Sequence, residues 1–229
     1  MLSSPTLTLP VRQPSPFVFI IDSPSSHDLF EGYTIGMALR DALRSIRVPH
    51  FYTLAVNRET LGTAMGQKLE RCVNQMQPFA QTTDAVPLIH LCMHGANEGI
   101  GLTDGSFIGW PELRQLLVSH NQIKGYDPFV CMASCNGIAA SSMAHAYDSV
   151  FSYLIGNTGP VLQSDLTVAY LAFYNQIFLK RATLEQSVMT MKSASGDQNF
   201  FYSSGQLLKS QKFYELSSDW LSPSWQTGM

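Results

Sequence analysis

Two apolar runs, each leading into a reactive side chain, are the feature that most constrains this chain. One run covers residues 87–93 and leads into His94-Gly95, and the other covers 128–134 and leads into Cys135-Asn136-Gly137. Continuous apolar runs of this length are typical of strands that are buried on both faces of a parallel sheet. The carboxyl ends of parallel strands meet at one edge of the sheet, where α/β proteins bind ligands. We therefore expect an imidazole and a thiol together at that edge.

The segments around these runs predict an α/β fold. Strand-like segments at 17–21, 50–56 and 150–155 alternate with segments in which apolar residues recur at helical spacing. Strands separated by helical patterns indicate right-handed crossovers and a mainly parallel central sheet flanked by helices. The glycine-rich loop over 95–109 is typical of a tight β-ribbon or a lid.

Length and charge narrow the class of protein. The 229 residues, 45% of them hydrophobic, are enough for one sizeable core. We expect a flexible N-terminal arm over 1–16, a single domain over 17–216 and a C-terminal tail over 217–229.

A net charge of −3 without a basic block argues against nucleic acid and anionic membranes as partners. No leader peptide or membrane-length apolar run is visible, which favours a cytoplasmic protein with free thiols.

The pairing of His94 with Cys135 predicts nucleophilic catalysis. A thiol of ordinary pKa is only slightly ionised at neutral pH, so it attacks a carbonyl well only when a nearby imidazole takes its proton. The backbone N–H groups of Gly95 and Cys135 are the candidate donors for the oxyanion that forms. Because no carboxylate is clearly placed to orient the imidazole, we expect a dyad, with Glu98 as the candidate for support.

The other cysteines and histidines have structural interpretations. Cys92 and Cys131 lie inside the two strands and are expected to pack as small hydrophobic residues, and His90 is expected to be a hydrogen-bonded core histidine. Four further histidines have no companions at metal-ligand spacing: His27, His50, His120 and His145. We therefore expect no metal and no cofactor.

Several short motifs carry a resemblance to a known family. They are His90–Gly95, Gly101–Gly105 before Trp110–Leu113, Ala133–Gly137, Ile155–Val161, and Phe173-Tyr174. On these residues the chain resembles the CHAT branch of the caspase-like cysteine peptidases, the group that includes caspases, metacaspases, separases and gingipains. The motifs occur in the family's order and span most of residues 17–195.

The resemblance implies a caspase-like three-layer sandwich and endopeptidase activity on a protein substrate. It implies that His94 is the base and Cys135 the nucleophile, and it suggests substrate-binding roles for Asp22, Asn157 and Asp165. It also implies control by a regulatory protein partner or an activating cleavage, and a setting in bacterial signalling or defence by analogy. The oligomeric state does not follow from it.

Two departures from the family pattern affect what the resemblance implies. Gln163 stands two positions after Val161, where many relatives have an acidic residue, and Asp165 follows two positions later. A preference for basic substrate side chains therefore does not follow, although Asp22 and Asp165 remain available for one. The helical repeats that commonly accompany CHAT domains are not found in this sequence.

Two other interpretations compete with a caspase-like peptidase. The segment Ala133–Gly137 loosely resembles a nucleophile elbow, which suggests a thiol variant of the α/β-hydrolases. That fold places its histidine after the nucleophile, and His145, only ten positions on, is the one available. The second alternative is a catalytically silent caspase-like interaction domain, against which the intact His94 and Cys135 argue.

Overall fold

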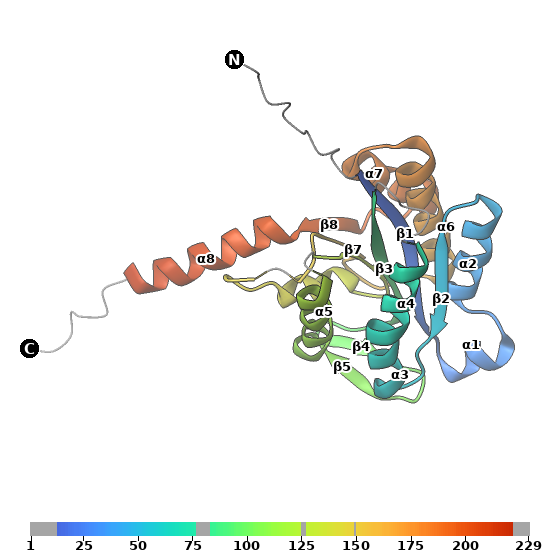
Figure 1. Cartoon of the computed structure of the whole chain (residues 1–229), viewed down its shortest axis with the longest axis horizontal. Helices are drawn as coiled ribbons and strands as arrows, with labels where there is room; N and C mark the ends of the chain where they lie inside the picture. Colours follow the sequence, from blue (N-terminus) through green and yellow to red (C-terminus); the bar gives the residue numbers. More distant parts are fainter. Residues whose placement is uncertain (1–12, 77–82, 125–126, 149, 222–229) are drawn as a thin grey trace, which may run out of the picture.

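The computed structural model describes residues 13–76, 83–124, 127–148 and 150–221. Its main sheet has the strand order β2-β1-β3-β6-β7-β8 (Figure 1). The first five of these strands are parallel, and β8 runs antiparallel to β7. The predicted mainly parallel sheet is confirmed. The strand bounds are β1 Gln13–Ser23, β2 His50–Leu54, β3 Thr83–Gly95, β6 Phe129–Ala133, β7 Tyr153–Asn157 and β8 Phe200–Ser204.

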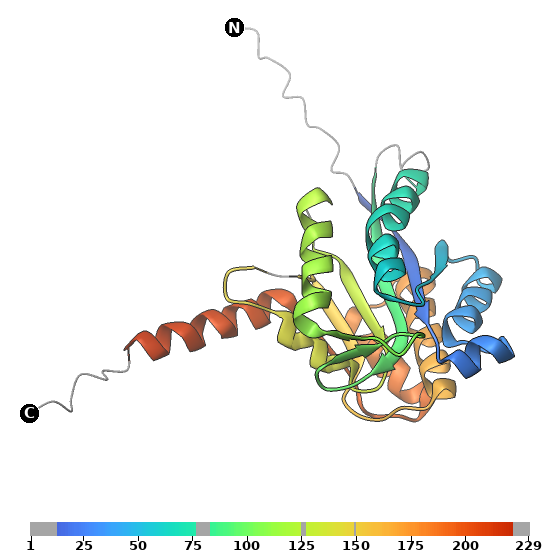
Figure 2. The ribbon, with the colours of Figure 1, turned by 90° about the horizontal axis from the view of Figure 1, so that it is seen from below.

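Helices cover both faces of the sheet, which gives the predicted three layers (Figure 2). One face packs against α3 (Arg58–Thr63), η1 (Ala64–Lys68), α4 (Leu69–Met76), α5 (Trp110–Lys124) and the 3₁₀ helix η3 (Gly137–Met143). The other face packs against α2 (Ile35–Ser45), α6 (Gln163–Tyr174), η4 (Asn175–Lys180) and α7 (Leu184–Ser195). Each face has its own cluster of buried apolar side chains, because a parallel sheet must bury both sides.

The glycine-rich loop forms the predicted β-ribbon. Its two strands are β4 (Gly99–Gly101) and β5 (Phe107–Gly109), which pair antiparallel. The end of β3 joins this ribbon, since His94 faces Gly101 and Gly95 faces Ile100. The ribbon therefore holds the end of the strand that carries His94.

The ends of the predicted domain differ from the structure. β1 begins at Gln13, so the sheet includes the last four residues of the expected arm. Pairing with β2 begins only at Val18, so Pro14 and Pro16 pair with β3 alone. Their backbone nitrogens, which carry no hydrogen, can face the unpaired edge of β1. Helix α8 (Gly205–Leu221) includes the first five residues of the expected tail and extends away from the body (Figures 1 and 2). The remainder of the arm and of the tail lies outside the described residues.

Four elements have no counterpart among the sequence predictions: α1 (Ser26–Glu31), α7, β8 and α8. A readable signal existed for α7. Thr183 and Gln186 form a reciprocal capping box at its start, which is a recognisable helix-initiation pattern. Helix α1 buries none of its residues, so apolar periodicity could not reveal it.

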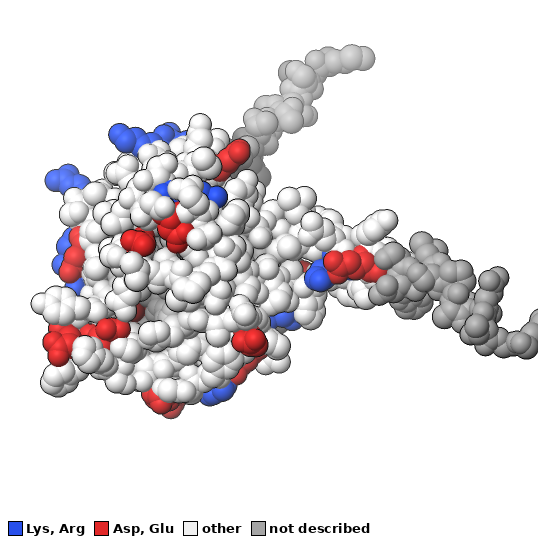
Figure 3. All heavy atoms as spheres, turned by 180° about the vertical axis from the view of Figure 1, so that it is seen from behind, with Lys and Arg blue, Asp and Glu red and all other residues white. Residues whose placement is uncertain are grey.

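The outer surface is weakly charged. On the face shown in Figure 3, acidic and basic side chains are scattered among many uncharged ones, without a broad patch of one sign. In the described part of the chain, no helix combines the length and the hydropathy that a bilayer-spanning segment needs.

Candidate active site

The register of the sheet brings His94 and Cys135 to one place. β3 and β6 are neighbours, with Leu88 facing Phe129 and Cys92 facing Ala133, an offset of 41 positions. His94 and Cys135 are also 41 positions apart, so they stand in register just beyond the last paired residues. Neighbouring strands lie about 4.8 Å apart. β3 and β6 are therefore adjacent and end at the same edge of the sheet, which is the condition under which His94 and Cys135 can meet.

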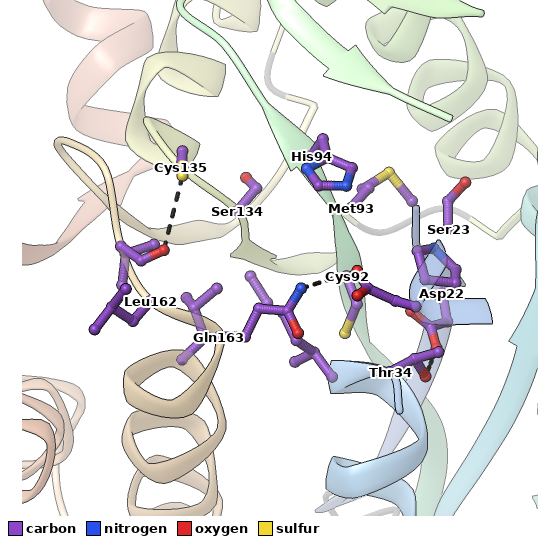
Figure 4. Close-up of a pocket in the computed structure, with 16 residues that line it drawn as sticks. Asp22, Ser23, Thr34, Cys92, Met93, His94, Ser134, Cys135, Leu162 and Gln163 are labelled. Atoms are coloured by element: carbon purple, nitrogen blue, oxygen red, sulfur yellow. Dashed lines mark hydrogen bonds between the residues drawn. The ribbon is translucent and has the colours of Figure 1, made fainter. Parts of the chain in front are cut away.

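Both side chains border one cavity on the α2 and α6 side of the sheet (Figure 4). Because side chains alternate along a strand, Cys92 shares its face with His94, and Ala133 shares its face with Cys135. The cavity has a volume of about 280 Å³, with Asp22, Cys92 and Ala133 at its base and with Val161 and Leu162 as part of its wall. The base is one continuous row of the sheet, since Asp22 faces Cys92 and Cys92 faces Ala133.

Two glycines and one left-handed residue allow the strand tips to approach. A Cβ atom on Gly95 would lie 2.0 Å from the carbonyl oxygen of Cys135, and a Cβ atom on Gly137 would lie 2.7 Å from Cβ of Met132. Asn136 has φ 51°, a left-handed conformation that Asn tolerates better than most residues. The chain therefore turns sharply after Cys135, and the sequence Cys-Asn-Gly meets the steric demands of that turn.

The thiol of Cys135 is half-buried and points away from the imidazole. Its Sγ lies 3.9 Å from the carbonyl oxygen of Val161, to which the S–H group can donate weakly. In Figure 4, Ser134 lies between Cys135 and His94, and the thiol is directed toward the segment that precedes α6. His94 is exposed. Proton transfer between these groups needs the thiol to change rotamer, which partly exposed side chains do within nanoseconds.

Asp22 is a buried carboxylate at the base of the cavity. It accepts hydrogen bonds from Thr34 Oγ1 at 2.5 Å and from the Tyr52 hydroxyl at 3.0 Å. Burial raises the pKa of Asp22, and these two hydrogen bonds oppose that rise. A Cβ atom on Gly36 would lie 2.4 Å from Cγ of Asp22, so the carboxyl group lies directly against the first turn of α2. Among the described interactions, its hydrogen-bond donors are neutral groups.

Asp28 is the carboxylate that the sequence analysis missed. It lies on α1, lines the same cavity as His94, and accepts a hydrogen bond of 3.0 Å from Nε2 of Gln163. Hydrogen bonds from Ser25 and Gln163 lower the pKa of Asp28, and the nearby His27 and His94 contribute to the same effect. The pattern Ser25-x-x-Asp28 is a helix-capping signature, so the sequence did contain a signal for α1.

Three other candidate residues do not line this cavity. Asn157 is buried at the end of β7, donates to Asp197 at 2.6 Å and accepts from the N–H of Gly159 at 2.8 Å. Asp165 lies in the first turn of α6, where Leu162 rather than an acidic residue occupies the N-cap. Glu98 is exposed, and its main-chain carbonyl accepts from the N–H of Trp110. The roles of Asn157 and Asp165 in substrate binding, and of Glu98 in support of His94, stay predictions.

A second imidazole and thiol face each other deeper in the sheet. His90 and Cys131 are register partners, and both are fully buried. Burial lowers the pKa of His90 to about 3 and raises the pKa of Cys131 to about 12. Nδ1 of His90 lies 2.7 Å from the Tyr174 hydroxyl, while Nε2 has no hydrogen-bond partner in the described structure. The predicted core histidine is thus hydrogen-bonded at only one nitrogen.

The site consists of a thiol, an imidazole and carboxylates. All four cysteines are free thiols. Among the described residues, no three His, Cys, Asp or Glu side chains converge as the ligands of a metal ion would.

Comparison with known proteins supports the fold. No protein-family model matches the chain, and no curated protein sequence matches it. Among solved structures, the chain is similar to a secreted C11 cysteine protease of Bacteroides thetaiotaomicron, iotapain. The TM-score is 0.53 at 12% sequence identity, over 86% of this chain and 68% of that one. At this identity the similarity extends to the fold alone. The chain therefore shares the fold of that structure, a mixed α/β fold with a mainly parallel central sheet.

Proposed function

We propose that this protein is a cysteine endopeptidase in which Cys135 is the nucleophile and His94 is the general base. One observation carries the proposal: the two residues stand in register on neighbouring strands, on the same face, and border one cavity. Proton transfer requires hydrogen-bond reach, and adjacent strand tips provide it once the thiol turns toward the imidazole.

The reaction proceeds in two halves. His94 takes the proton of the Cys135 thiol, and the thiolate attacks the carbonyl carbon of the scissile peptide bond. The C–N bond breaks as the imidazolium returns its proton to the leaving amine, which leaves an acyl thioester on Cys135. Water then attacks the thioester with His94 as base, the C–S bond breaks, and the carboxylic acid product departs.

Two further groups support the charges that form. The backbone N–H groups of Gly95 and Cys135 are the proposed donors to the oxyanion. The missing side chain of Gly95 lets the two strand tips lie close together, because a Cβ atom there would meet the carbonyl oxygen of Cys135. Asp28 is the proposed carboxylate that stabilises the imidazolium of His94 across the cavity, in place of Glu98.

Substrate binding is proposed to use the base of the cavity. Asp22 provides a carboxyl group there. Burial raises its pKa and so favours its protonated form, whereas a positively charged substrate group beside it would favour the carboxylate. Asn157 supports the site indirectly, because it holds Gly159 in the segment that leads to Val161. Asp165 adds negative charge in the first turn of α6.

The setting and control of the enzyme are part of the proposal. We assign it to the CHAT branch of the caspase-like peptidases on the sequence motifs above, and to the cytoplasm on its free thiols. Control by a protein partner or an activating cleavage is proposed from the family resemblance alone.

A peptide-library cleavage profile tests the activity. The wild-type protein is expected to cleave a subset of peptides, and Cys135→Ala and His94→Ala are expected to abolish that cleavage while they retain the wild-type circular dichroism. Cys131→Ala is the matched control, because Cys131 occupies the same strand and the same face, four residues deeper. Cleavage by the Cys135→Ala protein would overturn the assignment.

The two alternatives are less well supported. An α/β-hydrolase mechanism would use His145, but His145 is exposed beyond η3 and does not line the cavity of Cys135. A silent interaction domain would be favoured if Cys135 of the folded protein failed to react with thiol-directed electrophiles.

A further inference from the structure

A second cavity lies directly beside the candidate active site. It has a volume of about 420 Å³ and lies between the α1–α2 turn, α2 and the start of α6. Thr34, Ile35 and Gln163 line both cavities, so the two cavities adjoin along these residues. Nothing in the proposed chemistry at Cys135 uses this second cavity.

The first cavity is too small to hold more than a short part of a polypeptide substrate. Its volume of about 280 Å³ lies at the lower limit of small-molecule pockets. An extended peptide advances about 3.3 Å per residue, so residues that flank the cleaved bond must lie over neighbouring surface. The second cavity is the adjoining hollow that such a residue would meet.

The wall between the two cavities is held in place. Thr34 caps α2 by accepting from the N–H of Met37 at 3.1 Å, and its hydroxyl also donates to Asp22. Gln163 is tied to Asp28 across the top of the site. These contacts keep the second cavity separate and preformed, which lowers the entropic cost of filling it.

The chemistry of the second cavity favours a large uncharged side chain. Tyr33, Ile35, Met37 and Ala38 give it an apolar and aromatic side, and the rest of its lining is glycine, uncharged polar side chains and Asp41. The Tyr33 side chain is 79% exposed, so its ring is free to close over a bound group. Aromatic rings pack well against other rings and against the thioether of methionine.

Charge excludes one class of occupant. Asp41 lines the second cavity and is paired with Arg40, and Asp28 lines the first. An acidic substrate side chain would lie beside these carboxylates and would have to compete with Asp41 for the guanidinium of Arg40, which is already paired.

We infer that the second cavity is a substrate subsite that binds a large apolar side chain, aromatic by preference, at a position that flanks the cleaved bond. The inference rests on the proposed peptidase function and adds the substrate class that the site selects. Selectivity arises because burial of an aromatic side chain in a preformed apolar hollow is favourable, whereas alanine at the same position leaves the hollow empty.

Cleavage kinetics test the inference. A positional library with the wild-type protein identifies the preferred flanking position, and peptides with Phe, Ala or Glu there are then compared. We expect kcat/KM about tenfold higher for Phe than for Ala, mostly through KM, and lowest for Glu. Ala38→Trp fills the cavity from an exposed position of α2 and is expected to remove the preference for Phe. A single-residue coumarin substrate, which does not reach the second cavity, should be cleaved by this variant as by wild type.

Matched variants make each outcome decisive. Ala194→Trp is the control, since Ala194 is exposed and lines a different groove between α6 and α7; it should keep the full preference. Tyr33→Ala should weaken the preference without loss of the fold. Cleavage by the wild type with no preference at any flanking position, or equal behaviour of the two tryptophan variants, would overturn the subsite alone. Absence of any cleavage by the wild type would overturn the subsite together with the proposed function.

Discussion

Two imidazole–thiol pairs follow each other along β3 and β6, one inside the paired strands and one at the end of β3 and just beyond the end of β6, and they have opposite properties. His90 and Cys131 are register partners, and His94 and Cys135 repeat that arrangement four residues further along with the same offset. The inner pair is sealed under α6, where the Tyr170 ring lies 4.5 Å from that of His90. The outer pair opens onto a cavity.

Residue type alone does not define a catalytic pair. Burial disfavours charged forms, so the inner imidazole stays neutral and the inner thiol stays protonated. A nucleophilic cysteine must reach the thiolate and must also reach a substrate. In parallel sheets both conditions are met at the carboxyl edge, where the strands end and loops leave room for ligand.

The largest expected effect separates the two thiols by activity. Cys135→Ala should lower kcat/KM by about 10⁴-fold or more, because it removes the nucleophile. Cys131→Ala should leave kcat/KM within about twofold and should instead destabilise the fold by about 1–3 kcal/mol through the cavity it creates. Peptide cleavage assays and urea unfolding measure the two effects. An equal loss of activity in both variants would mean that Cys135 and Cys131 do not differ in function.

Chemical labelling should separate the thiols next most strongly. Iodoacetamide is expected to modify Cys135 at least about a hundredfold faster than Cys131, because a buried thiol reacts only after the protein opens. Mass spectrometry of peptides from quenched time points gives both rates from one sample. In urea the two rates should converge, which serves as the control. Similar rates in the folded protein would show that the inner pair is accessible.

The buried imidazole should make the fold sensitive to acid. The folded pKa of His90 is about 3, against 6.5 for an ordinary histidine, so below pH 6.5 the unfolded chain binds a proton that the folded chain does not. The stability is fully present above pH 6.5 and is lost as the pH falls toward 3. By pH 4 this single group should lower the free energy of unfolding by about 3 kcal/mol.

Removal of the His90 imidazole tests the direction in which stability depends on pH. His90→Phe should unfold with a flatter dependence on pH between 6.5 and 4 than the wild type, whatever its stability at pH 7. Urea titrations at several pH values measure the difference. Parallel curves for the two proteins would mean that His90 gains its proton without unfolding.

The smallest expected effect concerns Asp28, the carboxylate that lines the cavity of the outer pair, His94 and Cys135. Asp28→Asn should lower kcat by about tenfold, equivalent to about 1.4 kcal/mol, because it removes negative charge from beside the imidazolium formed during the reaction. Glu31→Gln is the matched control, since Glu31 is an exposed residue of the same helix and does not line the cavity. If the two variants have the same kcat, Asp28 has no part in catalysis.

Part of the fold could be read from local patterns, and the remainder could not. Buried strands and the helices between them have apolar runs and helical spacing, so their order along the chain was predictable, whereas the adjacency of β3 and β6 in the sheet needed the tertiary structure. Helix α1 buries no residue, and β8 is antiparallel at the edge of the sheet, next to a strand about 45 residues earlier. Such elements leave little apolar signal, and the sequence analysis missed them together with Asp28.

The sequence predicted that an imidazole and a thiol would follow two buried strands, each with a glycine one or two positions later. It did so because strand period and glycine content are local properties. The sequence also placed His90 in the core. The tertiary structure added what seals it there, since Tyr170 and Tyr174 of α6 pack against its ring. It also brought Asp28 to Gln163, 135 positions away in the chain. Burial and long-range contacts set the ionisation of a side chain, and neither can be predicted from the residues next to it in the sequence.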